Sequence, residues 1–280
     1  MNGSLVIHGG RDENGPLQDE SSRLWLWDTK NHVWTTFGPE QPGGKTPTPR
    51  YGHRIFFDGK DNLLVLHGGR TNNDETESAE TWAFHFKQAA WCQLPFAPAV
   101  PLGSVFDSGT LYTVTSESDW IQSLHVPSSD NATSAEWSIS ETSAGPQRAP
   151  GAVTTVPLRT GMGRCYLIQL FGGDDGSGPR LVGDVWSLQL PAGSFTGAGI
   201  KDVIRERLPK LESGFLSWAK LEVSPQGLEE QATEGGGKMD PGPRTASGVD
   251  YCGDGRRIML WGGINAKGEV EGDGWILDFA

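Results

Sequence analysis

The sequence predicts an all-β protein built from repeated sheets, and three observations support this. An apolar strand that ends in a Gly-Gly pair occurs four times. Nine of the eleven tryptophans follow these strands, or one degenerate copy, at two fixed positions. Glycine is abundant, with 39 residues, and stretches of helical periodicity are few. Such a repeat indicates sheets that bury their faces against one another, as the blades of a β-propeller do.

The glycines and tryptophans of the repeat have separate physical roles. Glycine suits the end of a strand where the backbone turns tightly or passes close to a neighbour. A tryptophan buries roughly 150–250 Å² and fills the wedge between adjacent sheets. The Gly-Gly pairs are Gly9-Gly10, Gly68-Gly69, Gly172-Gly173 and Gly262-Gly263, and the tryptophans are Trp25 and Trp34, Trp82 and Trp91, Trp120 and Trp137, Trp186 and Trp218, and Trp275.

We expect a single propeller domain over residues 1–280 with five recognisable blades. Their approximate ranges are 1–40, 49–97, 102–142, 150–224 and 244–280. The first and last blades are incomplete, with three expected strands each, and the other three blades have four.

The first blade has expected strands at 4–7, 23–28 and 33–37, with a turn rich in turn-forming residues at 28–31. The second is the most regular, with strands at 50–57, 63–66, 81–86 and 91–94. The third lacks the glycines after its strand at 111–115, and its strands are more polar. The fifth has strands at 248–252, 257–261 and 273–279.

The fourth blade contains a long insertion, residues 193–215, between its strands at 184–190 and near Trp218. Ile200, Val203, Ile204 and Leu208 recur with helical spacing, and Pro209 follows them. We therefore expect one short amphipathic helix there, which covers the rim of the domain or, as the alternative, docks a partner.

Composition excludes several classes of function. The formal net charge of −12 argues against nonspecific binding to nucleic acid or to an anionic membrane. No apolar run approaches the roughly 20 residues of a membrane span. A strand follows Met1 almost at once, so no secretory leader is expected. Three scattered cysteines, Cys92, Cys165 and Cys252, suggest reduced thiols and a cytoplasmic protein.

The Gly-Gly pairs, the tryptophan pairs and the openings Pro49-Arg50 and Pro243-Arg244 resemble kelch repeats of the galactose oxidase/kelch superfamily, in particular the fungal type. The resemblance covers nearly the whole chain. It implies a parent fold of six blades closed by strands from both ends of the chain, so this chain looks like an N-terminally shortened version. The alternative is a five-bladed ring with imperfect closure.

The resemblance also implies a binding mouth at one face, because in kelch adaptors of ubiquitin ligases polar residues just past Gly-Gly contact the ligand. Arginine there suits a carboxylate, which it binds through two parallel hydrogen bonds. The alternative is that these are solvated turn residues. The mouth residues expected here are Arg11, Asn14, Arg70, Asn72, Asn73 and Asp174, together with Tyr51, His53, Trp120 and Trp261 near the central channel.

No catalytic or metal-binding motif is expected. His8, His53 and His67 are interpreted as hydrogen-bonded structural imidazoles rather than metal ligands. Plant nitrile-specifier proteins resemble this fold and bind iron through E-x3-D-x3-H, but Glu77, Thr81 and His85 have threonine at the central position. The copper site of galactose oxidase needs a tyrosine and histidine set that this sequence does not match. We therefore expect no metal and no cofactor.

The sequence favours a non-catalytic scaffold that binds a protein segment or small molecule through one loop face, without nucleic-acid or membrane partners. The alternative is an enzyme of fungal specialised metabolism, a cofactor-free cyclase or lyase whose pocket would include Tyr51, His53, Trp120 and Trp261. Such chemistry depends on shape and a few hydrogen bonds, so it leaves no motif. A nitrile-specifier-like protein is a further alternative.

Overall fold

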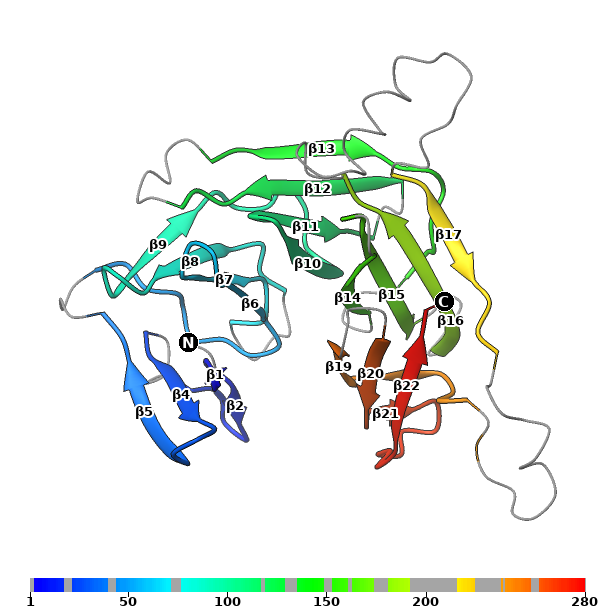
Figure 1. Ribbon diagram of the computed structural model, residues 1–280, viewed down its shortest axis with the longest axis horizontal. Coiled ribbons are helices and arrows are strands. Elements are labelled where there is room, and N and C mark those ends of the chain that lie inside the picture. The colour runs from blue at the N-terminus through cyan, green and yellow to red at the C-terminus, as the bar shows by residue number, and fades with distance from the viewer. Residues whose placement is uncertain are drawn as a thin grey trace. The chain divides into compact units, whose positions relative to one another are not determined.

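The structure, a computed structural model, is entirely β within the residues that it describes (Figure 1). The described residues are 3–17, 22–39, 44–71, 77–116, 119–128, 135–148, 153–160, 163–173, 181–191, 216–224, 238, 240–252 and 257–279. The helix expected within the insertion 193–215 falls outside them.

Five sheets form the blades of a β-propeller, which confirms the predicted fold class. Blade 1 has the order β1 (Ser4–Ile7), β4 (Leu24–Asp28) and β5 (Val33–Phe37). Blade 2 has the order β6 (Arg54–Asp58), β7 (Leu63–His67), β8 (Thr81–His85) and β9 (Ala90–Leu94). Blade 3 has the order β10 (Gly103–Asp107), β11 (Thr110–Val114), β12 (Trp120–His125) and β13 (Trp137–Glu141).

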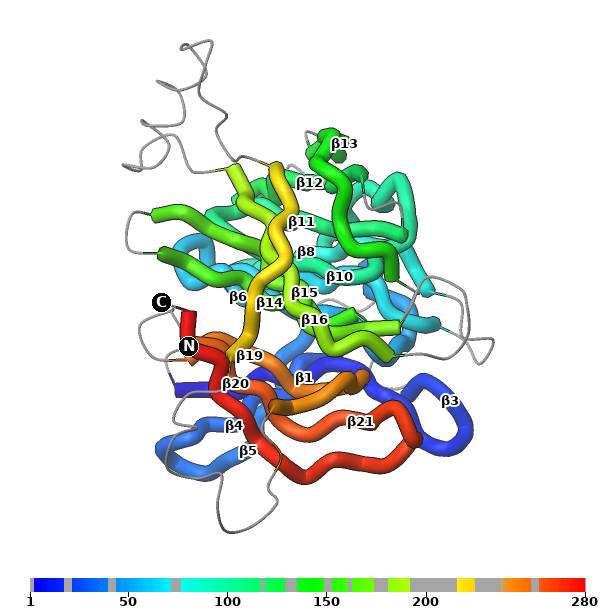
Figure 2. Tube along the Cα trace, turned by 90° about the vertical axis from the view of Figure 1, so that its right-hand side faces the viewer, coloured from blue at the N-terminus to red at the C-terminus, as the bar shows by residue number. Residues whose placement is uncertain are grey.

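The remaining sheets follow the same order along the chain. Blade 4 contains β14 (Thr154–Arg159), β15 (Cys165–Gly173), β16 (Leu181–Gln189) and β17 (Trp218–Leu221), of which β15, β16 and β17 run side by side in Figure 2. Blade 5 contains β19 (Gly248–Cys252), β20 (Arg257–Trp261) and β22 (Gly274–Asp278). Two small pairs, β2 (Arg11–Asp12) with β3 (Gly15–Pro16) and β18 (Arg244–Thr245) with β21 (Ile264–Asn265), lie in the loops.

The chain forms two compact units. The first comprises Met1–Pro101, Gly109–Tyr112 and Gln122–Ile139, and the second comprises Leu102–Ser108, Thr113–Ile121 and Ser140–Ala280. The first therefore holds blades 1 and 2, and the second holds blades 4 and 5.

The first tryptophan of the repeat occupies the same register position in four blades. Its partner on the neighbouring strand is the residue two positions before the first glycine of the Gly-Gly pair. In blade 4 the partner is three positions before that glycine, because β15 has a bulge between Leu170 and Gly172. The pairs are Ile7 with Trp25, Leu66 with Trp82, Gln169 with Trp186, and Leu260 with Trp275. The sequence repeat is thus a structural repeat, and side chains at matching positions point to matching faces of each sheet.

Apolar side chains fill the seams between consecutive blades. Leu24 of blade 1 packs with Leu64, Leu66 and Phe84 of blade 2. In the second unit, the residues of the seam between blades 4 and 5 include Val156, Ile168, Leu170, Val185, Ile258 and Leu260. These seams are the hydrophobic core, because each sheet buries its faces only against its neighbours.

The second tryptophan of the repeat connects its blade to the preceding one. The indole N–H of Trp91 in β9 donates a 3.0 Å hydrogen bond to the carbonyl of Ser22, just before β4. Similarly, Trp137 in β13 donates to the carbonyl of Pro95 after β9, at 2.9 Å. These indoles therefore stabilise the seams by polar contacts in addition to the apolar area that they bury.

Three buried arginines bind carboxylates placed two residues before the first tryptophan. The pairs are Arg50 with Glu80, Arg148 with Asp184, and Arg244 with Asp273, in blades 2, 4 and 5. In two of them the tryptophan indole also donates to the carboxylate, from Trp82 to Glu80 at 3.1 Å and from Trp186 to Asp184 at 2.9 Å. A buried arginine is tolerated here because a carboxylate neutralises its charge and accepts a hydrogen bond from its guanidinium.

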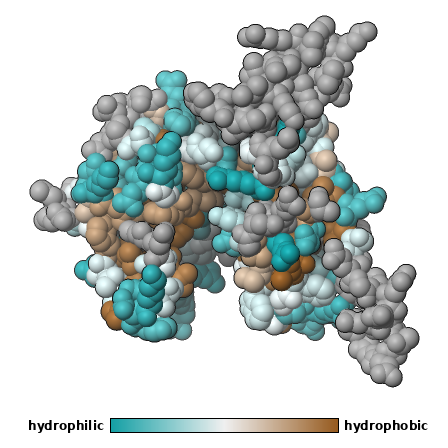
Figure 3. Space-filling model, in the orientation of Figure 1, coloured by the Kyte–Doolittle hydropathy of each residue, from teal (hydrophilic) through white to brown (hydrophobic). Residues whose placement is uncertain are grey.

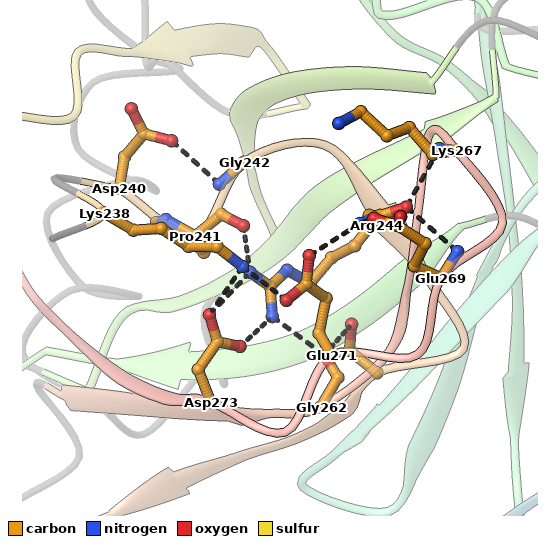
Figure 4. A network of polar contacts seen from close by, with 12 residues as sticks. Lys238, Asp240, Pro241, Gly242, Arg244, Gly262, Lys267, Glu269, Glu271 and Asp273 are labelled. Carbon is orange, nitrogen blue, oxygen red and sulfur yellow. Dashed lines mark hydrogen bonds and ion pairs between the residues drawn. The ribbon is translucent and has the colours of Figure 1, made fainter. Parts of the chain in front are cut away.

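The contacts of Arg244 illustrate this arrangement (Figure 4). Its guanidinium donates to the carbonyl of Gly262 at 2.9 Å, to Asp273 Oδ1 at 2.6 Å and to the carbonyl of Pro241. The bond from Arg244 holds the pKa of Asp273 well below its usual value. Lys238 approaches the same carboxylate at 3.4 Å. One side chain thus joins the opening of blade 5, its glycine turn and the strand that carries Trp275.

The glycine pairs of blades 1 and 2 provide room for the segment that connects these two blades. A Cβ on Gly9 would lie 2.5 Å from the carbonyl oxygen of Arg50, and one on Gly69 would lie 2.6–2.9 Å from His53 atoms. Both glycines also have positive φ. The expected strand at 50–57 is wrong at its start, since β6 begins at Arg54 and Arg50 serves instead as the buried cation.

Replacement of Arg50 by methionine should lower the free energy of unfolding by about 3 kcal/mol, because it leaves the carboxylate of Glu80 without its cationic partner. Urea denaturation of the purified protein measures this change. The matched control is Arg257→Met, which breaks the well-exposed pair with Asp278 and should cost less than about 1 kcal/mol. Equal effects of the two substitutions would contradict a special role for Arg50.

Replacement of Gly69 by alanine should destabilise the protein by at least about 1 kcal/mol more than Gly52→Ala. Both glycines have positive φ, so both substitutions incur backbone strain. Only at Gly69 would the new Cβ collide with the backbone of His53, while Gly52 has open space around it. Thermal unfolding of the two variants tests this, and equal losses would show that the close approach is not a constraint.

Candidate functional site

Three of the predicted mouth residues come together in the first unit. Arg11 lies in β2, and its guanidinium carbon is 5.0 Å from the centroid of the Tyr51 ring, a cation–π contact. Tyr51 and Arg70 exchange backbone hydrogen bonds of 3.1 and 2.9 Å. Two residues that directly follow Gly-Gly pairs, one in each of two blades, therefore meet at one tyrosine. We name Arg11, Tyr51 and Arg70 the arginine–tyrosine cluster.

Local structure explains why Arg11 is presented there. The β2–β3 hairpin pairs Arg11 with Pro16 and Asp12 with Gly15. The carboxylate of Asp12 accepts a 2.7 Å bond from the backbone N–H of Asn14, so the turn is closed by an aspartate side chain. Asn14 is exposed in this turn. The predicted residues Asn72, Asn73 and Asp174 lie outside the described residues.

Arg70 also binds Glu77, a residue that the sequence reasoning did not include in the mouth. Its Nε donates to Glu77 Oε1 at 2.8 Å, and the two residues form a β-bridge. Both side chains are mostly shielded from solvent. Three acidic residues follow Arg70 in the same polar loop, namely Asp74, Glu75 and Glu77. The sequence does not indicate which of them pairs with Arg70.

His53, two residues after Tyr51, pairs with His8. The distance between His8 Nδ1 and His53 Nε2 is 3.1 Å, and the two rings meet edge to face with centroids 5.0 Å apart. The other ring nitrogen of His53, Nδ1, is buried and has no hydrogen-bond partner in the described structure. His8 also contacts the ring of Trp91 at 5.3 Å.

Burial keeps two of these imidazoles neutral. It lowers the pKa of His53 to about 3, with further contributions from His8 and Arg50. It also lowers the pKa of His67 to about 4, and Arg50 adds to this effect. His67 Nδ1 is 2.9 Å from the hydroxyl of Thr81. His8 and His67 are buried and His53 is partly buried, and each of the three rings lies within hydrogen-bonding distance of a neighbouring side chain.

The other two predicted residues belong to the second unit. Trp120 opens β12 and is partly exposed. Trp261 ends β20, and its ring lies against Gly274 of β22, where an added Cβ would be 2.5 Å from the ring. Trp261 is therefore on an outer face of its sheet, together with Met259 and Ile276.

The side chains of the Glu77, Thr81 and His85 motif have separate partners, since Glu77 binds Arg70 and Thr81 contacts His67. Among the described residues, no three histidine, cysteine or acidic side chains are grouped as metal ligands would be. The three cysteines are free thiols. In the described parts of the chain, no helix has the length and hydrophobicity needed to cross a membrane.

Comparison with known proteins supports the fold. No family model matches the sequence. A solved structure of YjhT is similar, with a TM-score of 0.57 and 12% sequence identity, and the match covers 99% of this chain and 79% of that one. At this identity the likeness shows the β-propeller fold alone.

Stability should fall as the pH is lowered from about 6.5 toward 5. In this range the unfolded chain takes up protons at His53 and His67, whose ordinary pKa is 6.5, while the folded chain does not because their pKa values there are about 3 and 4. Each histidine contributes at most about 1.4 kcal/mol per pH unit. Urea denaturation at several pH values should give a shallower dependence for His53→Gln, and an unchanged dependence would contradict the buried neutral state.

Proposed function

We propose that this protein is a non-catalytic kelch-type propeller that binds a protein segment or a small molecule through the loops after its Gly-Gly pairs. The observation behind this proposal is the arginine–tyrosine cluster, in which Arg11 contacts the Tyr51 ring and Arg70 pairs with the Tyr51 backbone. Rigid sheets support these loops, which is the usual arrangement of a binding site on a scaffold. The kelch assignment draws on the repeat itself and on the Pro-Arg openings at Arg50 and Arg244.

The chemistry of the cluster favours a carboxylate-bearing ligand. Arg11 is exposed, and an arginine can hold a carboxylate through two parallel hydrogen bonds. Arg70 is already engaged by Glu77 and shows that a carboxylate fits its guanidinium. The Tyr51 ring adds an apolar surface for the neighbouring part of the ligand. We therefore favour an acidic peptide segment or a small organic acid as the ligand class.

The proposed location is the cytoplasm. The three cysteines are free, and Cys165 is buried. Burial raises the pKa of the Cys165 thiol, with a further contribution from Asp107, which makes it unreactive. Free thiols in a protein of this size are typical of reducing compartments.

The Arg11→Ala/Arg70→Ala variant should lose affinity for acidic ligands by roughly tenfold to a hundredfold, because each charge-assisted hydrogen bond contributes about 1.5–3 kcal/mol. A panel of acidic peptides and dicarboxylic acids is first screened against the wild-type protein by thermal shift. Fluorescence anisotropy with the best labelled peptide then compares the variants.

Arg257→Ala is the matched control, because Arg257 is an exposed arginine paired with an aspartate elsewhere in the protein. Arg11→Ala alone leaves the Arg70–Glu77 pair intact and should give part of the loss. Equal affinity of the wild type and the double variant would show that the ligand does not use this cluster.

A further inference from the structure

Arg70 is the middle residue of a row of side chains in the first unit. It forms one antiparallel β-bridge with Tyr51 and another with Glu77. Residues that face each other across an antiparallel bridge have their side chains on the same side of the sheet. Tyr51, Arg70 and Glu77 therefore follow one another on one side, and Arg11 contacts the Tyr51 ring. All four residues belong to the first unit.

Backbone contacts hold Glu77 in this position. The N–H of Ser78 donates to the carbonyl of Gly69 at 2.7 Å, next to the bridge between Glu77 and Arg70. The chain that leaves the Gly-Gly pair thus returns to it at Glu77. Because the Glu77 carboxylate is tethered beside Arg70, it competes at a high effective concentration with any anion that approaches this arginine.

The pair of Arg70 and Glu77 differs from the ion pair in the core of the same blade. Arg50 is fully buried and binds two backbone carbonyls in addition to Glu80. Arg70 Nε donates to Glu77 Oε1 at 2.8 Å, and neither side chain is fully buried. Ion pairs in contact with water contribute little to stability, so exchange of Glu77 for another carboxylate costs the fold little. Figure 3 shows hydrophilic surface beside apolar surface over the sheets of the first unit.

We propose that Glu77 is an internal competitor at this site, which occupies Arg70 in the ligand-free protein and releases it when the carboxylate of an acidic ligand binds. This inference rests on the proposed function, because it concerns the same arginine–tyrosine cluster. A ligand carboxylate has the charge and geometry of the Glu77 carboxylate, so both suit the same guanidinium. Two carboxylates beside one guanidinium repel each other, which weakens the binding of either.

The competitor makes the site selective. A ligand with a single carboxylate gains at Arg70 only what Glu77 loses, so its net binding is weak. A ligand that also contacts the Tyr51 ring, or that brings a second carboxylate to Arg11, gains additional binding energy that Glu77 does not cancel. Glu77 therefore sets an affinity threshold that favours extended acidic peptide segments over small monocarboxylic acids.

Fluorescence anisotropy with a fluorescein-labelled tetraglutamate peptide tests the proposal. Glu77→Gln removes the competing charge and keeps the size of the side chain, so it should bind the peptide roughly tenfold more tightly than the wild type. This gain must depend on Arg70. In a protein that already carries Arg70→Ala, the addition of Glu77→Gln should change the affinity by less than about twofold.

Asp58→Asn is the matched control, because Asp58 has the same charge at the far end of β6, the strand that follows Tyr51. The Asp58 carboxylate accepts a 2.9 Å bond from the backbone N–H of Lys60, which an asparagine can retain. This variant should bind the peptide within about twofold of the wild-type affinity. A gain as large as that of Glu77→Gln would show that the peptide responds to net charge alone, and the inference would be wrong.

The outcomes separate this inference from the proposed function. If the wild type binds the peptide and Arg11→Ala/Arg70→Ala weakens binding, but Glu77→Gln gives no gain, the inference alone is wrong. If neither the wild type nor Glu77→Gln binds the peptide, the proposed function is wrong and the inference fails with it. Circular dichroism verifies the folding of each variant. Should Glu77→Gln not fold, Glu77→Asp replaces it, with a smaller gain expected because the shorter side chain holds Arg70 less closely.

Discussion

The buried guanidinium of Arg50 needs a counter-charge and hydrogen-bond acceptors, and this requirement organises blade 2. An unpaired buried ion costs several kcal/mol, so the chain around Arg50 has little freedom. Arg50 binds the carbonyls of Thr48 and Gly68 and the carboxylate of Glu80. It thereby fixes the segment before the sheet, the glycine turn and the strand that carries Trp82 relative to one another. Arg244 makes the corresponding contacts in blade 5.

The same constraint shapes the surface loops of the candidate site. The carbonyl of Gly68 points toward Arg50, and Gly68 and Gly69 both have positive φ. This turn brings Gly69 against His53 and places Arg70 beside Tyr51. The polar cluster at the surface is thus held in place by an ion pair in the core. The backbone of Arg70 is already fixed by these contacts. A ligand that binds the guanidinium of Arg70, as we propose, would therefore lose little entropy in ordering this residue.

Periodicity carried most of what could be predicted from the sequence. The Gly-Gly and tryptophan repeats predicted five blades, and the register of Trp25, Trp82 and Trp275 shows that blades 1, 2 and 5 are equivalent at this position. Contacts between residues far apart in the chain produce no periodic pattern in the sequence and could not be predicted from it. The pairing of His8 with His53 joins residues 45 positions apart, and Glu77 is one of several acids in its loop.

The central claim is that Arg50 and Glu80 stabilise blade 2 as a coupled pair, which a double-mutant cycle measures most directly. The cycle compares Arg50→Met, Glu80→Gln and the double variant by urea denaturation. The account predicts that the double variant is more stable than the sum of the single losses implies, by at least about 1.5 kcal/mol. Strictly additive losses would contradict it, because they would mean that each side chain contributes to stability without the other.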